Sequence, residues 1–365
     1  MATIEELQQR AWALTEESRW AEAIPATEEA LRLMEVESGA ESVDVANLSS
    51  ELAVLLEKTN RFEEAIVAAG RAVSILKEYE PFEEFARELA TILVRSHGVG
   101  AMALRAVGRF AEARAEIQGS VSVAERYMGP ADELTGAAYC GLGMFYKYSG
   151  EFDEAERAYK RSMEILVPIC GEESEILATL YHNLGGLEHS RQNYEAGVPW
   201  ARKAYEVRKK LAGAECSETV ADAVALAGLL DEMGPSAESE RIYREALVTW
   251  ERIFGPEHYE IASTLHNLAA LRRDMGDRAE AIQLYRQAYE MKRRLLGAQS
   301  PDTGLTATCL AQLLGQEPGG RKEALELAQA ALSAYERNCE EKHPERVACA
   351  ELVQGLKGSN ASFQG

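Results

Sequence analysis

The sequence predicts an all-α fold, a solenoid of about eight helix pairs closed at its C-terminal end by one capping helix. Three observations predict it. Two small residues recur with a nearly constant step of 42 residues, and apolar side chains between them follow the period of a helix. The composition also favours helix, because aromatic residues make up only 7% while Ala, Leu, Glu and Arg are abundant.

Each repeat carries one small residue in its first helix (helix A) and a second one in its second helix (helix B), twelve residues later in the first seven repeats and thirteen in the last. The helix A positions are Ala11, Ala53, Ala101, Gly143, Gly185, Ala227, Ala269 and Ala311. The helix B positions are Ala23, Ala65, Ala113, Ala155, Gly197, Ser239, Ala281 and Ala324. The steps are 42 residues, except for 48 between the second and third repeats and 43 before the last helix B position. Two registers with one period define eight repeats.

Residues 132–170 illustrate how one repeat is built, with apolar side chains three or four residues apart on each side of a Ser149-Gly150 break. We expect Gly143 and Ala155 to lie where helices A and B cross. The turn between the helices needs a positive φ. We expect that conformation at Gly150, Gly234, Gly276, Asn60 and Asn193.

The irregularities of the repeat predict three parts along the chain. Residues 1–79 form an N-terminal pair of repeats, and residues 80–357 form the longer solenoid. An irregular joint at 76–110 accounts for the 48-residue step, with a helix break near Tyr79–Pro81 and an altered superhelix angle. We expect a capping helix over 345–357 and a disordered tail over 358–365.

The repeat motif resembles the tetratricopeptide repeat (TPR). Leu142-Gly143, Tyr146, Ala155 and Tyr159 match its pattern, and Leu184-Gly185 repeats part of it. The 42-residue period and linking segments such as FGPEHYEIASTLHNLA (254–269) resemble the kinesin light chain subfamily, whose repeat portion alone is covered. This resemblance implies a right-handed α-solenoid whose helices A line a concave groove. In kinesin light chains, a ladder of Asn and basic residues in that groove holds extended peptides.

Net charge excludes some classes of partner. With 39 basic and 60 acidic residues the chain carries −21, which disfavours nucleic acid and anionic lipid as partners. No apolar run approaches the length of a membrane span. The start of the chain is acidic and amphipathic, and its six cysteines include no CxxC pair. We therefore expect a cytoplasmic protein that does not bind membranes.

No catalytic or cofactor motif stands out in the sequence. Phosphate-binding loops and a GxSxG elbow are absent. His182 and His189 are seven residues apart, about 10.5 Å along a helix, too far to share one zinc ion. Cys140 is the one candidate nucleophile, with His182 in the equivalent place of the next helix A, but neighbouring helix axes lie about 8–10 Å apart. We expect no metal and no cofactor.

The architecture that the resemblance implies selects the residues that face the groove. If the small residue of helix A is position 8, the groove positions are 2, 5, 6, 9, 12 and 13. From these positions we take twelve candidate binding residues: Arg95, Met102, Arg105, Met144, Lys147, Tyr148, His182, Asn183, His189, His266, Asn267 and Arg273. In repeats three to five they include three fixed cations and no carboxylate, which suits a partner with acidic groups.

Three hypotheses for function stay open. The leading one is a non-catalytic scaffold that binds an acidic or C-terminal segment of another protein in the groove. The second is a small-molecule sensor or an enzyme with Lys147, Tyr148, His182 and His189 as acid–base groups. The third is a homo-oligomer in which the acidic N-terminal repeats of one copy dock on the basic groove of another.

Overall fold

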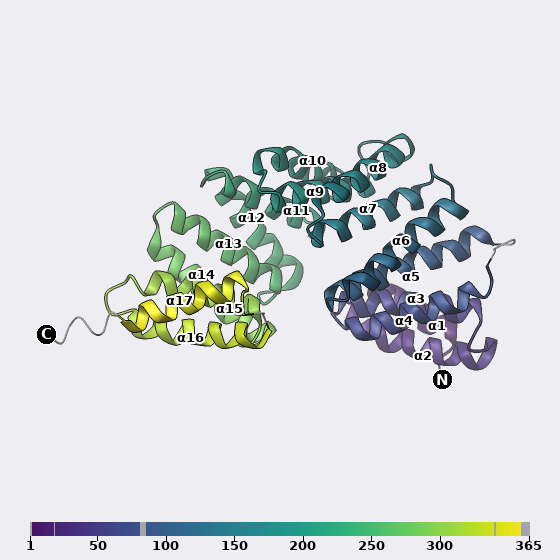
Figure 1. Ribbon diagram of the computed structural model, residues 1–365, viewed down its shortest axis with the longest axis horizontal. Coiled ribbons are helices and arrows are strands. Elements are labelled where there is room, and N and C mark those ends of the chain that lie inside the picture. Colours follow the sequence, from purple (N-terminus) through teal and green to yellow (C-terminus); the bar gives the residue numbers. More distant parts are fainter. Residues whose placement is uncertain (1, 18, 81–84, 339–340, 359–365) are drawn as a thin grey trace. The chain divides into compact units, whose positions relative to one another are not determined.

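The computed structural model describes residues 2–17, 19–80, 85–338 and 341–358, which contain seventeen α-helices and no strand (Figure 1). The helices A are α1 (Ile4–Glu16), α3 (Val43–Lys58), α5 (Ala86–Ala106), α7 (Glu133–Tyr148), α9 (Glu175–Ser190), α11 (Ser217–Glu232), α13 (Tyr259–Asp274) and α15 (Pro301–Leu314). The helices B are α2 (Trp20–Ser38), α4 (Phe62–Lys77), α6 (Phe110–Tyr127), α8 (Phe152–Cys170), α10 (Tyr194–Ala212), α12 (Ala237–Phe254), α14 (Arg278–Leu296) and α16 (Arg321–Asn338). The last helix is α17 (Pro344–Gly358).

The predicted fold class is confirmed, with eight helix pairs in chain order followed by one unpaired helix. That unpaired helix, α17, packs on α16, and its Val353 and Leu356 complete the apolar cluster of the last pair. It therefore acts as the predicted cap, one residue longer at each end than the predicted range 345–357. Of the predicted tail, residues 359–365 lie outside the described part of the chain.

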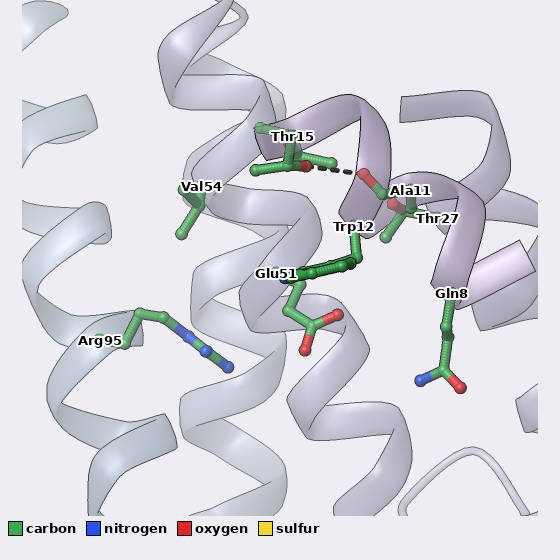
Figure 2. A pocket seen from close by; sticks show the side chains of 9 residues that line it. Gln8, Ala11, Trp12, Thr15, Thr27, Glu51, Val54 and Arg95 are labelled. Carbon is green, nitrogen blue, oxygen red and sulfur yellow. Dashed lines mark hydrogen bonds between the residues drawn. The ribbon is translucent and has the colours of Figure 1, made fainter. Parts of the chain in front are cut away.

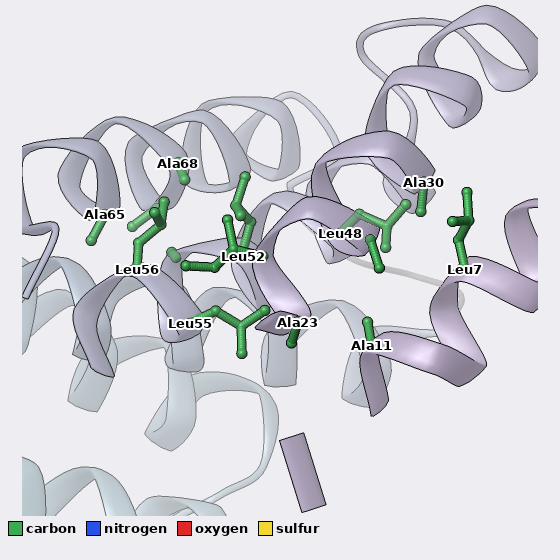
Figure 3. Close-up of a cluster of buried hydrophobic side chains, with 14 of the residues drawn as sticks. Leu7, Ala11, Ala23, Ala30, Leu48, Leu52, Leu55, Leu56, Ala65 and Ala68 are labelled. Atoms are coloured by element: carbon green, nitrogen blue, oxygen red, sulfur yellow. The ribbon is translucent and has the colours of Figure 1, made fainter. Parts of the chain in front are cut away.

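The two registers of small residues form the core. Every alanine in either register is buried, as are Gly143, Gly185, Gly197 and Ser239. In the first two repeats Ala11, Ala23 and Ala65 lie among the leucines of α1 and α3 (Figure 3). At Gly143 the reason for the small residue is visible, because an added Cβ would lie 2.5 Å from the Tyr159 ring of the paired helix.

One turn residue differs from the prediction. Asn60, Gly150, Gly234 and Gly276 all have positive φ, as expected, but in the fifth repeat Gln192 (φ 58°) adopts this conformation and Asn193 does not. The prediction of Asn193 was wrong because it followed residue preference instead of register. In each of these repeats the positive-φ residue comes seven residues after the small residue of helix A, and Gln192 follows Gly185 by seven.

By compactness the chain divides into two units, Met1–Arg191 and Gln192–Gly365, each described here by itself. Within the units, successive helices A contact one another at α3–α5, α5–α7, α7–α9, α11–α13 and α15–α17. Within each unit, successive helices B make no comparable contact in the described residues. Because helices A approach each other more closely than helices B do, helices A line the concave side of each unit.

The 48-residue step is absorbed by a longer helix. In register, α5 would begin near residue 91, but it begins at Ala86, so the additional residues add more than one turn at its N-terminal end. Ala90 in this part of α5, and Leu93 just after it, pack with α3 and α4 in one apolar cluster. Pro81, where the sequence predicts the break, lies outside the described residues, whereas α4 ends shortly before it at Lys77.

In the described chain, no helix combines the length and the apolar character that a bilayer span requires.

Candidate groove site

Three of the predicted groove residues meet on the concave side of the first unit. The guanidinium carbon of Arg105 on α5 lies 4.2 Å from the centre of the Tyr148 ring on α7, and Lys147 Nζ lies 4.5 Å from the same centre. These distances are typical of cation–π contacts. We call Arg105, Lys147 and Tyr148 the cationic cluster.

The cationic cluster reaches a third helix A. A Cβ added at Gly186 on α9 would lie 3.3 Å from Lys147 Nζ, so the ammonium group of Lys147 occupies the space that a side chain at 186 would need. Gly186 is a groove position of the fifth repeat by the rule given above. The cluster therefore extends over α5, α7 and α9, three successive helices of the concave side.

Neither cation of the cluster is neutralised within the described residues. No carboxylate lies within 4 Å of Arg105 or Lys147, and Arg105 Nε is buried without a hydrogen-bond partner. The cluster thus combines two uncompensated positive charges with an unused donor.

Most other arginines of α5 to α8 have acidic partners. Each of them lies within 4.0 Å of a carboxylate: Arg87, Arg109, Arg114, Arg126, Arg157 and Arg161. In the second unit, ion pairs join successive helices B in one register, Arg202–Glu238 at 2.8 Å and Arg244–Glu280 at 2.9 Å, followed by Arg286–Glu323. Positive charge is therefore compensated on the helix B side and left open in the cationic cluster.

Arg95, the third predicted cation, is held by its neighbours. Its Nε donates to Ser50 Oγ at 2.8 Å and its Nη2 donates to Asn47 Oδ1 at 2.7 Å, both on α3. Burial lowers the pKa of Arg95, an effect that nearby Glu51 opposes. Arg95 therefore belongs to a polar network with α3 and does not contribute a third open charge to the cluster.

Arg95 also lines a cavity of about 390 Å³ between α1, α2, α3 and α5, which we call the N-terminal pocket (Figure 2). The other lining residues are Gln8, Ala11, Trp12, Thr15, Thr27, Glu51, Val54 and Leu55. Figure 2 shows Trp12 on α1, Glu51 on α3 and Arg95 on α5 around the pocket, with the Arg95 guanidinium pointing toward the side where Glu51 lies. The volume is within the range of ligand-binding pockets.

The sequence prediction missed the N-terminal pocket although its own rule finds most of it. In the first repeat, positions 5, 9 and 12 are Gln8, Trp12 and Thr15, and in the second repeat positions 6 and 9 are Glu51 and Val54. The prediction applied the rule only from the third repeat onward.

Asn183, predicted to face the groove, is 7% exposed, and its Nδ2 lies 3.5 Å from Cys140 Sγ. It therefore links α9 to α7 and leaves little surface for a partner. Burial raises the pKa of the Cys140 thiol to about 11. Cys140 is consequently protonated at neutral pH, unlike the thiolate that nucleophilic catalysis requires.

The remaining candidates of the first unit surround the cluster along the same helices. Met102 on α5 is half-buried and packs with the apolar cluster of Leu104 and Phe145, and Met144 on α7 is also half-buried. On α9, His182 is half-buried and His189 is exposed.

The candidates of the second unit are largely occupied by neighbours. His266 Nδ1 lies 3.0 Å from Thr306 Oγ1 on α15, and burial lowers its pKa to about 4. Arg273 donates to Asp274 from Nε at 2.7 Å and from Nη2 at 3.0 Å, so its charge is compensated. Asn267 is half-buried on α13. Of the twelve candidates, the cationic cluster alone combines open charge with an aromatic face in the described residues.

A family model for the tetratricopeptide repeat matches residues 90–166, 223–294 and 260–337, and a second one matches 177–215. No curated protein matches the chain in sequence. Among solved structures, BtubC (BKLC) from P. vanneervenii is 20% identical and covers 65% of this chain and 92% of its own, with a TM-score of 0.56. A putative kinesin light chain of Podosopora anserina with nearly identical TPR-like repeats is 18% identical, covering 56% of this chain and 97% of its own, with a TM-score of 0.47.

A Rap protein complexed with competence and sporulation factor is 11% identical and covers 98% of both chains, with a TM-score of 0.54. At these identities the likenesses show the fold alone. The family models together cover more than half of the chain. This chain therefore belongs to the tetratricopeptide repeat family, and its structural neighbours include kinesin light chain-like repeat proteins.

Proposed function

We propose that this protein is a non-catalytic scaffold that binds an acidic or C-terminal segment of another protein on the concave side of its first unit. Tetratricopeptide repeat proteins generally mediate protein–protein binding. The observation that carries the finer proposal is the cationic cluster, where Arg105 and Lys147 have no acidic partner among the described residues, in a chain of net charge −21.

The chemistry of the cluster favours carboxylates. Arg and Lys donate charge-assisted hydrogen bonds to carboxylate oxygens, and Arg105 Nε is an unused donor. The Tyr148 ring, which both cations contact, adds an aromatic surface beside them. A peptide that brings two acidic groups, or one acidic group and a terminal carboxylate, would compensate both charges.

A role without catalysis is part of the proposal. The raised pKa of Cys140 supports it, since the thiol is not activated. Lys147 Nζ lies over the Tyr148 ring, and this arrangement differs from the hydrogen-bonded pair that a nucleophile and its base would form. The self-associating alternative predicts the same groove chemistry, with the acidic N-terminal repeats of a second copy as occupant.

The test uses fluorescein-labelled peptides and fluorescence anisotropy. The probes are hexaglutamate with a free C-terminus, its C-terminal amide, and a Gly-Ser hexamer. We expect the wild-type protein to bind both hexaglutamate forms, more weakly as salt rises, and not the Gly-Ser peptide. Arg105→Gln/Lys147→Gln should weaken binding at least tenfold.

The matched control is Lys160→Gln/Arg161→Gln on α8, which removes the same charge at residues that have acidic partners. An equal loss in both double variants would mean that hexaglutamate senses only net charge, and the groove assignment would be wrong. Sedimentation of the unliganded protein at low and high salt separates the self-associating alternative, because a charge-driven dimer weakens with salt.

A further inference from the structure

The N-terminal pocket joins an aromatic face to an open carboxylate. Trp12 is 68% exposed although it lines the pocket. Glu51 Oε1 accepts a hydrogen bond from Asn47 Nδ2 at 3.0 Å, but no cation lies within 4 Å of the Glu51 carboxylate in the described residues. An exposed indole and a carboxylate without an ion pair, lining the same pocket, are groups that bind a cation with an apolar stem.

The pocket also contains a positive charge, and its position matters. Arg95 is fixed to α3 through Ser50 and Asn47, and Asn47 is the same residue that donates to Glu51. Asn47 therefore links Arg95 to Glu51 through hydrogen bonds, and the Arg95 guanidinium stabilises the side of the pocket that α3 forms. The other N–H groups of Arg95 are donors of the kind that a peptide carbonyl accepts.

The surrounding residues favour a positive occupant. The groove positions of α1 and α3 hold four carboxylates, Glu5, Glu16, Glu51 and Glu57, and one cation, Lys58, which is paired with Glu57 at 3.7 Å. Arg95 on α5 adds one further cation at the pocket. Ala11, Val54 and Leu55 supply apolar lining for methylene groups. The N-terminal pocket thus favours a positively charged ligand, whereas the cationic cluster favours a negatively charged one.

We propose that the N-terminal pocket is a subsite for a Lys or Arg side chain of the partner segment, with the cationic group between the Trp12 indole and the Glu51 carboxylate. The partner segment would then carry a basic residue on one side and acidic residues on the other. Arg95 and Arg105 are ten residues apart on α5, about 15 Å along the helix at 1.5 Å per residue. An extended segment covers this distance with about five residues.

The bipartite segment rests on the proposed function, but the subsite is tested without it. Three capped tripeptides serve as probes: acetyl-Gly-Lys-Gly-amide, the same peptide with norleucine in place of lysine, and the same peptide with glutamate. The readout is the ¹⁹F NMR spectrum of protein labelled with 5-fluorotryptophan. Because the chain has four tryptophans, Trp12→Phe assigns the Trp12 signal.

We expect the lysine peptide to shift the Trp12 signal with a saturable, salt-sensitive curve. The norleucine and glutamate peptides should leave it in place. Glu51→Gln should weaken lysine binding at least fivefold, while Glu37→Gln on the exposed end of α2 should not change it.

Equal shifts with lysine and norleucine would overturn the proposal, since they would show only an apolar contact. A shift with the glutamate peptide that disappears in Arg95→Gln would also overturn it and indicate an anion site. No shift with any peptide would show that the pocket is no subsite. Arg105→Gln/Lys147→Gln is expected to bind the lysine peptide normally, so failure of the subsite and failure of the proposed function give different results.

Discussion

Arg105 on α5 places its guanidinium 4.2 Å from the centre of the Tyr148 ring on α7, and this contact joins the third and fourth repeats across the groove. Tyr148 is more than half exposed, so the ring contributes a surface as well as a contact. This contact belongs to the cationic cluster. Among the described residues, the cluster is the one place on the concave side of the first unit where positive charges lie close together without acidic partners.

The first prediction concerns Tyr148. Tyr148→Phe keeps the aromatic face, so hexaglutamate affinity should stay within about twofold of wild type. Tyr148→Ser removes the face that positions both cations and should weaken binding several-fold. Anisotropy titration measures both. If the two variants behave alike, the ring does not position Arg105 and Lys147.

A second prediction tests helix packing inside one repeat. Gly143→Ala should destabilise the protein by about 1–3 kcal/mol, because the added Cβ would lie 2.5 Å from the Tyr159 ring. Gly141→Ala on the same helix is the matched control, since its Cβ meets Ile117 Cδ1 at an ordinary 3.5 Å. It should be neutral or stabilising by up to about 1 kcal/mol. Urea unfolding of both variants decides, and equal stability would contradict the packing account.

The buried ion pair between α10 and α11 gives a third prediction. Arg208 Nε donates to Asp222 Oδ2 at 2.7 Å, and both side chains are more than nine-tenths buried. Arg208→Met should cost about 3–5 kcal/mol, because it leaves a buried carboxylate without its cation. Arg208→Met/Asp222→Leu should cost less than the single variant. Thermal unfolding measures the difference, and a double variant worse than the single one would refute it.

A fourth prediction concerns pH. Burial, followed by the charge of Lys292, lowers the pKa of His266 to about 4 in the folded protein. Because the unfolded side chain titrates near pH 6.5, the unfolded state binds more protons between these values. The contribution of neutral His266 is therefore full above about pH 6.5 and is lost as pH falls toward 4, on the order of 1–3 kcal/mol.

The measurement compares the wild type with His266→Gln, in which the Thr306 contact can persist without titration. The wild type should lose more stability than the variant between pH 7 and pH 4.5, measured by urea unfolding at each pH. Parallel losses would show that His266 does not titrate with a lowered pKa.

The architecture followed from the sequence because packing imposes it on every repeat. Residues such as Gly143 and Ala155 must be small because the two helices of a repeat cross there. The same requirement recurs in every repeat, so the period of the small residues is visible in the sequence. The turn of the fifth repeat has the same explanation. Gln192 adopts the positive φ that was predicted for Asn193, because the repeat register determines the turn position more strongly than residue preference does.

The site was less predictable, because side-chain partners vary between repeats. Arg95 and Arg105 occupy comparable groove positions, yet Arg95 is bound by Asn47 and Ser50 while Arg105 contacts Tyr148. Likewise Arg273 has Asp274 beside it, which cancels its charge. The groove rule identifies which residues face the concave side, but the partners within hydrogen-bond reach decide which of them remain open to a ligand.

The central claim, that the cationic cluster binds acidic segments, is tested most directly by reversing its charge. Arg105→Glu/Lys147→Glu should lose hexaglutamate binding and gain binding of hexalysine. The same reversal at Lys160 and Arg161 on α8 should change neither preference by more than about twofold. If Arg105→Glu/Lys147→Glu retains hexaglutamate binding, or if both reversals alter it equally, the concave side of the first unit does not bind acidic segments in the way described.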